Sequence, residues 1–165
     1  MIYLHKRKEF SISEYFNELK VVPVAVSYEF DPNDINKAIE CVKTNQGIDY
    51  IKSSNEDISS IAKGITDKKG DVSINVGSPL NFVSDDTDQI SDQITKSIRN
   101  LYKPHSTNYA AYIKSKNEIL DHSFSESKIN DSIDYLESRA KLLTELEKEE
   151  LYSQYYECLI KKMGG

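Results

Sequence analysis

Apolar and polar residues follow two patterns that predict strands, and both patterns lie in the first half of the chain. Residues 21–28 (VVPVAVSY) are almost wholly apolar, which is typical of a strand buried on both faces of a sheet. Residues 72–76 (VSINV) alternate between apolar and polar, as a strand with one exposed face does. Pro23 stands near the start of the first run, where its missing N–H group costs at most one hydrogen bond of the sheet.

Apolar residues that recur at every third or fourth position predict three helices around these strands. The first helix is capped by Ser11 or Ser13 and runs to Lys20, the second ends at Gly47, and the third begins at about Ser54. Their apolar stripes are Tyr15, Phe16 and Leu19, then Ile35, Ala38, Ile39 and Val42, and then Ile58, Ile61, Ala62 and Ile65. The predicted order is therefore helix, strand, two helices and strand.

An acidic cluster follows the first strand. Asp31 fits the N-cap of the second helix, with Pro32 at the first helical position, where a missing N–H group costs nothing. Together with Glu29 and Asp34, Asp31 could also bind a cation. Capping explains the cluster more simply, so we expect no metal site.

The two predicted strands are far enough apart in sequence for a crossover connection between parallel strands. Two strands alone do not form a stable sheet, and each would have an open edge. The apolar run 21–28 fits the interior of a larger sheet. We therefore expect that part of the sheet lies outside this chain.

The composition changes near residue 84, after which the pattern predicts only helices. We expect residues 1–84 to form the C-terminal part of an α/β domain and residues 85–165 to form a helical extension packed on it. The fold class is thus α/β by element order and α+β by content. The later helices are one with the stripe Ile90, Ile94, Ile98 and Leu101 after Asp85, Asp86 and Asp88, one capped by Ser106 or Thr107, one from Ser125 to about Leu146, and one from Glu147 to Met163.

Composition and charge narrow the functional classes. The 165 residues suffice for one domain with a hydrophobic core, and the net charge of −6 disfavours nucleic-acid binding, which usually needs a basic surface. No apolar run approaches the roughly 20 residues of a membrane-spanning helix, and the N-terminal residues MIYLHKRKEF lack the apolar core of a signal peptide. Cys41 and Cys158 fit helical patterns as reduced thiols, so we expect a cytoplasmic protein.

The sequence contains no recognisable catalytic constellation. His5, His105 and His122 lack a carboxylate or serine at a spacing that would define a site, and surface positions explain them more simply. The sequence also lacks a glycine-rich phosphate loop and a paired-ligand metal motif. The eleven tyrosines fit core or interface positions, and the charge run 145–150 fits a solvated helix face.

Residues 21–32 (VVPVAVSYEFDP) resemble the last conserved block of the phospholipid/glycerol acyltransferase family. They are most similar to a bacterial branch in which the strand continues as S-Y-E-[YF]-D-P. Later segments resemble further blocks of that branch in the same order. These segments are 63–80 (KGI, then KGDVSINVGSPL), 94–102 with 107–112 (TNYAAY), and 135–139 (YLESR). The resemblance covers nearly the whole chain from about residue 11.

The family's catalytic blocks have no counterpart in this sequence. Members of the family carry H-x-x-x-x-D, in which the histidine is the general base that activates a glycerol hydroxyl and the aspartate orients it. They also carry E-G-x-R, whose arginine binds the substrate phosphate. The residues five positions after the three histidines are Phe10, Ala110 and Ser127. The resemblance thus implies the C-terminal half of an acyltransferase, with its catalytic blocks N-terminal to Met1.

Two classes of function follow. As part of an acyltransferase of glycerophospholipid synthesis, the chain would act on a glycerol-phosphate or lysophosphatidate acceptor, with acyl-CoA or acyl carrier protein as the donor and no bound cofactor. Val22, Pro23 and Val24 would form a wall beside the site, no residue of this chain would be catalytic, and the chain would be inactive alone. Its partner would be the missing N-terminal half or a second copy, in the cytoplasm or at the inner membrane face.

The alternative is a non-catalytic binding or scaffold module that uses the helical half or the exposed sheet edge. A membrane-surface role of this chain alone is disfavoured, because the helices from Ser125 onward mix acidic and basic residues.

Overall fold

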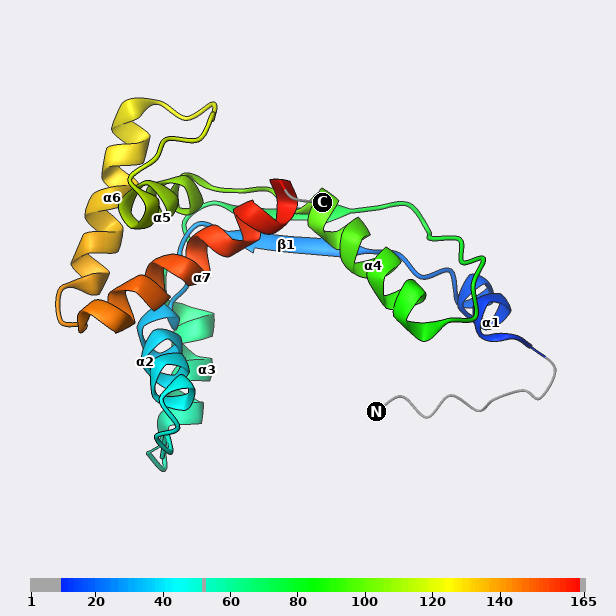
Figure 1. Cartoon of the computed structure of the whole chain (residues 1–165), viewed down its shortest axis with the longest axis horizontal. Coiled ribbons are helices and arrows are strands. Elements are labelled where there is room, and N and C mark those ends of the chain that lie inside the picture. Colours follow the sequence, from blue (N-terminus) through cyan, green and yellow to red (C-terminus); the bar gives the residue numbers. More distant parts are fainter. Residues whose placement is uncertain (1–9, 52, 164–165) are drawn as a thin grey trace. The chain divides into compact units, whose positions relative to one another are not determined.

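The computed structural model of the protein describes residues 10–51 and 53–163. Within these ranges it contains seven helices and one antiparallel sheet of two strands (Figure 1), which confirms the expected α+β content and the helical second half. No helix in these ranges combines the length and the hydrophobicity needed to cross a bilayer. The helices are α1 (Ile12–Leu19), α2 (Asp34–Asn45), α3 (Glu56–Thr66), α4 (Thr87–Leu101), α5 (Ser106–Lys116), α6 (Glu126–Ala140) and α7 (Glu145–Met163). The strands are β1 (Val24–Tyr28) and β2 (Val72–Val76).

The two strands pair directly with each other. The N–H of Gly77 donates to the carbonyl oxygen of Pro23 at 2.9 Å, and the N–H of Glu29 donates to that of Asp71 at 2.9 Å. The end of one strand thus lies beside the start of the other, which is the antiparallel arrangement. The connection through α2 and α3 is therefore not the parallel crossover considered from the sequence.

The expectation that the first strand is buried on both faces is wrong. Val24, Val26 and Tyr28 are 45, 54 and 37% exposed, whereas Ala25 and Ser27 are 3% exposed. Burial therefore alternates along β1, as it does in a strand with one covered face. The covered side chains are the small ones, and the large apolar ones face outward.

The chain divides into two compact units, and each strand passes from one unit into the other. Unit 1 contains the described residues 10–26 and 74–103, with α1 and α4. Unit 2 contains the described residues 27–73 and 104–163, with the other five helices. Each unit is thus built from two segments that are distant in the sequence.

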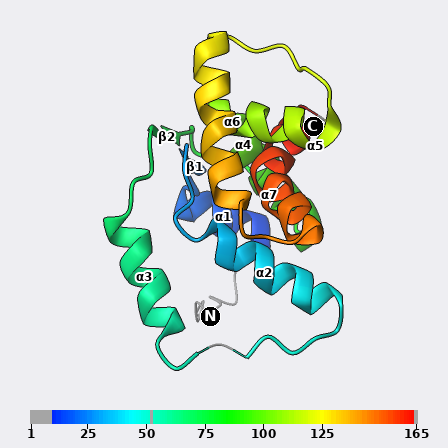
Figure 2. The same cartoon turned by 90° about the vertical axis from the view of Figure 1, so that its left-hand side faces the viewer.

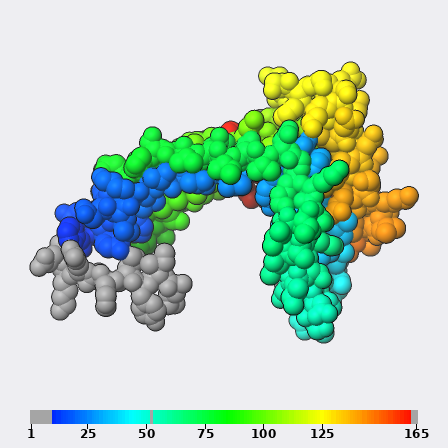
Figure 3. Space-filling model, turned by 180° about the vertical axis from the view of Figure 1, so that it is seen from behind, coloured from blue at the N-terminus to red at the C-terminus, as the bar shows by residue number. Residues whose placement is uncertain are grey.

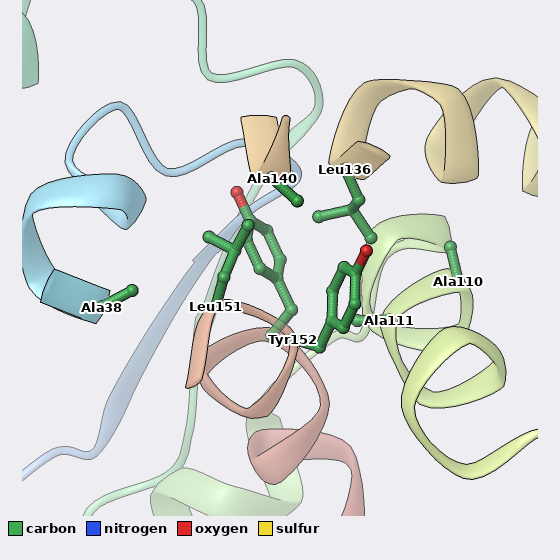
Figure 4. Packing of buried hydrophobic residues seen from close by; sticks show 8 residues of the cluster. Ala38, Ala110, Ala111, Leu136, Ala140, Leu151 and Tyr152 are labelled. Carbon is green, nitrogen blue, oxygen red and sulfur yellow. The ribbon is translucent and has the colours of Figure 1, made fainter. Parts of the chain in front are cut away.

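The core of unit 2 is formed by α2, α5, α6 and α7, which lie together in Figure 2. Ala38, Ala110 and Ala111 are completely buried, and such small side chains let helices approach closely. Leu136 and Leu151 are also completely buried and point into the space between these helices (Figure 4). Unit 2 therefore has a closely packed core of its own.

Helix α3 belongs to unit 2 but stands apart from the helices of its core (Figure 2). Its predicted apolar stripe forms, yet Ile58, Ile61 and Ile65 are 70, 63 and 75% exposed. The Asn33 side-chain amide donates to the carbonyl oxygen of Ser60 at 3.0 Å. The isoleucine stripe thus remains uncovered by the part of the chain that the structure describes.

In unit 1, α1 contacts the segment that precedes α4. The Asn17 side chain donates to the carbonyl oxygen of Phe82 at 2.8 Å and accepts from its N–H at 2.7 Å. The Phe16 ring lies 5.6 Å from the Phe82 ring, which is almost completely buried. Besides Phe82, Ala25 and Ile90 are buried apolar side chains of this unit. Its core is therefore much smaller than that of unit 2.

The predicted cap of the first helix is confirmed, whereas the predicted start of the second is displaced. Ser11 is the N-cap of α1, and its hydroxyl accepts a backbone N–H of the first turn. Helix α2 begins at Asp34 and not at Pro32. The reason is a turn, in which the Asp31 carboxylate accepts the N–H of Asn33 at 2.9 Å before the helix starts.

Helix α6 begins directly after its N-cap Ser125, where the sequence predicts the start of a helix, but it ends at Ala140 and not near Leu146. The cause is a second helix start in the following residues. Thr144 Oγ1 accepts the N–H of Glu147 at 3.4 Å, and the Glu147 carboxylate accepts the N–H of Thr144 at 2.8 Å. This reciprocal pair is a capping box, and it begins α7 at Glu145.

Candidate functional site

The densest group of polar side chains in the described residues is a buried network in unit 2, which we call the polar junction. It joins the end of β1 and the start of α2 to helices α5, α6 and α7. Its members are Glu29, Asp34, Ser106, Thr107, Lys128, Ser132, Arg139 and Tyr155.

Glu29 directly follows β1 on its covered side, and its side chain is only 4% exposed. Lys128 Nζ lies 2.6 Å from Oε1, Ser106 Oγ donates to the same oxygen at 3.1 Å, and the N–H of Asp71 donates to Oε2 at 3.1 Å. Burial acts to raise the pKa of Glu29, but the hydrogen bonds from Lys128, Asp71 and Ser106 outweigh it and lower this pKa below its ordinary 4.5. Glu29 is therefore an ionised group at neutral pH.

Two hydroxyl residues hold the start of α5 in this network. Thr107 Oγ1 donates to the carbonyl oxygen of Glu29 at 2.7 Å, and Ser132 Oγ donates to Ser106 Oγ at 2.7 Å. The prediction that Ser106 or Thr107 caps this helix is wrong, because His105 occupies the N-cap position. Both hydroxyls are used instead to pair buried oxygens of Glu29, which would be costly to leave unpaired.

Asp34 forms the second half of the polar junction, and its side chain is 1% exposed. Arg139 Nε donates to Oδ1 at 3.0 Å and to Oδ2 at 3.2 Å, and its terminal nitrogen pairs with the same carboxylate. Tyr155 donates to Oδ2 at 3.0 Å and accepts the N–H of Asp31 at 3.0 Å. The hydrogen bond to Asp34 raises the pKa of Arg139, and burial next to Asp34 raises the pKa of Tyr155.

The turn before β2 packs closely on this junction. Gly70 has a φ of +64°, and a Cβ atom at this position would lie 2.8 Å from both Glu29 Cβ and Phe30 Cε2. Only glycine fits both the backbone conformation and the space. The Phe30 ring lies 4.2 Å from the Tyr135 ring, which extends the contact to α6.

The charges of the polar junction are matched within the protein. The acidic residues considered as cation ligands form the pairs Glu29–Lys128, Asp31–Lys37 and Asp34–Arg139. No group of three or more His, Cys, Asp or Glu side chains is arranged for a metal ion in the residues that the structure describes. A buried carboxylate that is already paired cannot serve as an accessible base. The network can therefore fix β1 against three helices, and we assign it a structural role.

The histidines do not all lie at the surface. His105 is 4% exposed, and its Nε2 lies 3.2 Å from the hydroxyl of Ser27, which is 3% exposed. The expectation of a surface position is wrong for His105, because its side chain lies beside Ser27 on the covered side of β1. His122 is half-buried against the rings of Tyr109 and Phe124, and His5 lies outside the described residues. A substrate cannot reach the enclosed pair of Ser27 and His105.

The three residues predicted to form a site wall are not brought together. Val22 and Val24 are 40 and 45% exposed on one side of the strand region, whereas Pro23 is buried on the other side. A Cβ atom on Gly77 would lie 2.8 Å from Pro23 Cγ, so the proline is closely covered. Only Val22 and Val24 can contribute to one surface.

The two cysteines do not form a reactive site. Cys41 and Cys158 are half-buried thiols that form no disulfide bond. A hydrogen bond with Glu150 and, secondarily, burial raise the pKa of the Cys41 thiol, which makes it a poorer nucleophile. The nearby depression between α2 and α7 is lined by Val42, Glu150 and Tyr156, among others, and contains no residue of the polar junction.

Sequence inspection missed Lys128, Ser132 and Tyr155 as partners in the junction. They stand in helices far from β1 in the sequence, and local periodicity carries no information on such pairs. One signal was available. Glu29 shares the period-two side of β1 with Ala25 and Ser27, and an acidic group on a covered side requires a cation or several donors.

Comparisons with family models, with curated proteins and with solved structures each gave no match to this chain.

Proposed function

We propose that the chain forms the non-catalytic C-terminal part of an acyltransferase of glycerophospholipid synthesis, and that it transfers no acyl group unless a segment with the H-x-x-x-x-D block joins it. The polar junction is the observation that carries this proposal. Its residues come from the segment 27–32 (SYEFDP) and from later segments that resemble further blocks of the same family. These blocks are mutual partners in space.

Side chains of two blocks and the turn of a third supply the contacts. Thr107, from the segment TNYAAY, donates to the carbonyl oxygen of Glu29. Arg139, from the segment YLESR, donates to the carbonyl oxygen of Pro32 at 3.3 Å and pairs with Asp34. The turn at Gly70, from the segment KGD, packs on Glu29. An accidental resemblance gives no reason for these residues to meet, whereas a shared fold does.

In this proposal the acceptor is a glycerol-phosphate or a lysophosphatidate, and the donor is acyl-CoA or acyl carrier protein. The joining segment supplies the general base, which contributes roughly 10² to 10⁴ in rate. Val22 and Val24 line the apolar wall toward that segment, and the assembled protein works in the cytoplasm or at the inner membrane face. The chain itself holds no cofactor.

The test is an acyl-transfer assay with radiolabelled acyl-CoA and lysophosphatidate. The purified chain alone should show no turnover. A fusion that places the N-terminal blocks H-x-x-x-x-D and E-G-x-R of a bacterial acyltransferase of the same branch before this chain should show turnover. An open reading frame with both blocks next to the coding sequence would identify the natural segment.

Two controls make the result specific. The fusion with its block histidine replaced by alanine should lose activity, and the fusion that carries Asp34→Ala should lose it through misfolding, which circular dichroism would detect. Turnover by the chain alone would contradict the proposal. A fusion that folds but remains inactive would also count against it.

A second candidate is a binding module without any role in acyl transfer. The uncovered isoleucine stripe of α3 (Ile58, Ile61 and Ile65) favours it, because such a stripe normally packs against another layer. Under this candidate the fusion should show no turnover, and replacement of Ile61 by aspartate should abolish partner binding.

A further inference from the structure

Helix α3 contacts unit 2 with the side opposite its isoleucine stripe. Glu56, Ser60 and Gly64 on that side are half-buried. The Asn33 side chain donates to the carbonyl oxygen of Ser60 at 3.0 Å, and a Cβ atom on Gly64 would lie 3.7 Å from Asn33 Nδ2. Figure 3 shows the teal part of the surface, which contains α3, with no other segment over it in this view. The chain thus holds α3 by one side and leaves its apolar side uncovered.

The apolar side of α3 is complementary to itself. It comprises the isoleucine stripe and Ala62, which is also exposed. The positions 58, 61, 62 and 65 are spaced by three, one and three residues, so the pattern reads the same in both directions. Two antiparallel copies of the helix, related by a two-fold axis between positions 61 and 62, place Ile58 opposite Ile65 of the other copy. Ile61 then meets the small Ala62, which lets the two helices approach closely.

The charges at the two ends of α3 favour the same antiparallel arrangement. Residues 49–57, at its start, have a net charge of −2 from Asp49, Lys52, Glu56 and Asp57. Residues 63–71, at its end, have a net charge of +1 from Lys63, Asp67, Lys68, Lys69 and Asp71. An antiparallel pair brings the negative start of each helix beside the positive end of the other. A parallel pair would bring like charges together.

The charge of this region also argues for a second copy over other occupants. Residues 49–71 have a net charge of −1 in total. An anionic bilayer attracts basic segments, and a strongly charged polypeptide attracts a segment of the opposite sign. The nearly balanced charge around α3 favours neither of them. A second copy, in contrast, matches the charge at both ends of the helix.

The size of the apolar side predicts a weak dimer. The three isoleucines are 63 to 75% exposed and present roughly 130–250 Å² on the area scale of side-chain burial. A stable interface buries roughly 800 Å² on each partner. We therefore expect a reversible dimer with a Kd between about 10 μM and 1 mM.

We propose that the apolar side of α3 packs antiparallel against α3 of a second copy of this chain. Each copy buries its isoleucine stripe and Ala62, and Asp57 of each copy lies beside Lys68 of the other. These features belong to unit 2 alone, and the dimer forms whether or not the chain takes part in acyl transfer.

The first test is sedimentation equilibrium of the full chain between about 10 μM and 1 mM. The native chain should form dimers that dissociate on dilution. Ile61→Asp should raise the Kd at least about tenfold, because it buries two like charges next to the two-fold axis. Ile119→Asp is the matched control, since Ile119 is 81% exposed in the same unit but lies between α5 and α6. It should leave the Kd unchanged, and circular dichroism should show that both variants are folded.

An exchange of charges tests the antiparallel arrangement. Asp57→Lys and Lys68→Asp should each raise the Kd at least about threefold, because each variant brings like charges together at both ends of the dimer. A mixture of the two variants should form heterodimers about as tight as the native dimer, since the exchanged charges then meet with opposite sign. In a parallel pair neither single variant would weaken the dimer.

Several results would overturn the proposal. One is a native chain that stays monomeric up to about 1 mM, and another is a dimer that Ile61→Asp does not weaken, which would place the contact on another face. Charge variants that do not recover in the mixture would exclude the antiparallel pair. Flotation of the native chain with phosphatidylcholine–phosphatidylglycerol vesicles, lost in Ile61→Asp, would identify a lipid surface as the occupant.

Amide hydrogen exchange on the native protein tests the same contact without any variant. The N–H groups of residues 58–65 should exchange more slowly at about 1 mM than at about 10 μM, because the second copy covers this helix at the higher concentration. Equal exchange at both concentrations would contradict a dimer through α3.

Discussion

The polar junction of unit 2 and the ribbon face of unit 1, which is the exposed aliphatic side of the strands (Val22, Val24, Val26, Ile74 and Val76), invert the usual distribution of residues. In the junction, charged groups such as Glu29 and Asp34 are almost fully buried. On the ribbon face, aliphatic residues such as Val26 and Ile74 are more than half exposed. Each arrangement costs free energy unless a partner compensates it. The junction finds its partners within unit 2, and the ribbon face finds none in the described part of unit 1.

Unit 2 compensates its unusual buried charges with its own residues, whereas the exposed aliphatic side chains of unit 1 are not covered by its described residues. Unit 2 couples its ion pairs to a closely packed helical core around Leu136 and Leu151. Unit 1 buries few apolar side chains besides Phe82 and Ile90. Mutations in the core and the polar junction of unit 2 should therefore cost stability, and mutations on the ribbon face should leave stability unchanged.

The largest loss is expected for Asp34→Ala. The change leaves Arg139 and Tyr155 without the carboxylate that both of them bind. Removal of one partner of a buried ion pair costs about 3–5 kcal/mol, and urea unfolding should show a loss in this range. The control is Glu157→Ala, since Glu157 and Lys161 pair on an exposed helix face and contribute about 0.5 kcal/mol at most. Equal losses for both variants would disprove the structural role of the junction.

A loss of about 2–5 kcal/mol is expected for Leu151→Ala. Leu151 is completely buried between the helices of unit 2, so the shorter side chain leaves a cavity (Figure 4). Leu142 is 94% exposed, and Leu142→Ala should change the free energy of unfolding by less than about 0.5 kcal/mol. The two leucines are compared by thermal and urea unfolding. A small effect at Leu151 would mean that the core is not closely packed.

Local sequence signals predicted local structure, because the forces involved act over a few residues. Ser11 occupies the predicted N-cap of α1, and Asp86 and Ser125 stand at the predicted starts of α4 and α6, where each accepts a backbone N–H of the first helical turn. The apolar stripe with Ile58 and Ile61 also predicted a helix correctly, because both residues lie in α3. The predicted start of α2 and the predicted end of α6 were wrong. Asp31 forms a turn that delays the start of α2, and Thr144 forms the capping box that begins α7.

Contacts between distant segments were not predictable from local pattern. Asp34 and Arg139 are 105 positions apart, and no periodicity links them. The run 21–28 indicated a strand, but it could not show which of its sides the chain would cover. The structure covers Ala25 and Ser27 and leaves the valines exposed. The hydrophobicity of the run therefore predicted a strand, but it did not predict whether other residues of this chain cover its valines.

A loss of about 1.5–3 kcal/mol at neutral pH is expected for Glu29→Gln, because the hydrogen bonds to a charged acceptor are weakened. The pKa of Glu29 is lower in the folded protein than its ordinary 4.5, since the hydrogen bonds from Lys128, Asp71 and Ser106 outweigh burial. The folded state thus binds this proton less readily than the unfolded chain. The contribution of Glu29 is complete above pH 4.5 and is lost as the pH falls toward the lowered pKa.

The pH dependence of the urea midpoint tests this contribution. Between neutral pH and pH values below 4.5 the native chain should lose more stability than Glu29→Gln. The matched control is Glu145→Gln, because the Glu145 side chain is 88% exposed and its replacement should leave the native profile unchanged. Parallel profiles for the native chain and Glu29→Gln would show that Glu29 is not held as a carboxylate by the junction.

The smallest change in stability is expected for Val26→Thr, and its neighbour Ala25 supplies the contrast. Threonine keeps the β-branched shape that suits a strand, so a residue that is 54% exposed should tolerate it within about 0.5 kcal/mol. Ala25 is 3% exposed on the other side, and Ala25→Leu should cost about 1–3 kcal/mol through overpacking. Calorimetry on both variants compares the two sides of one strand. A loss of stability at Val26 as large as that at Ala25 would mean that unit 1 already covers both sides.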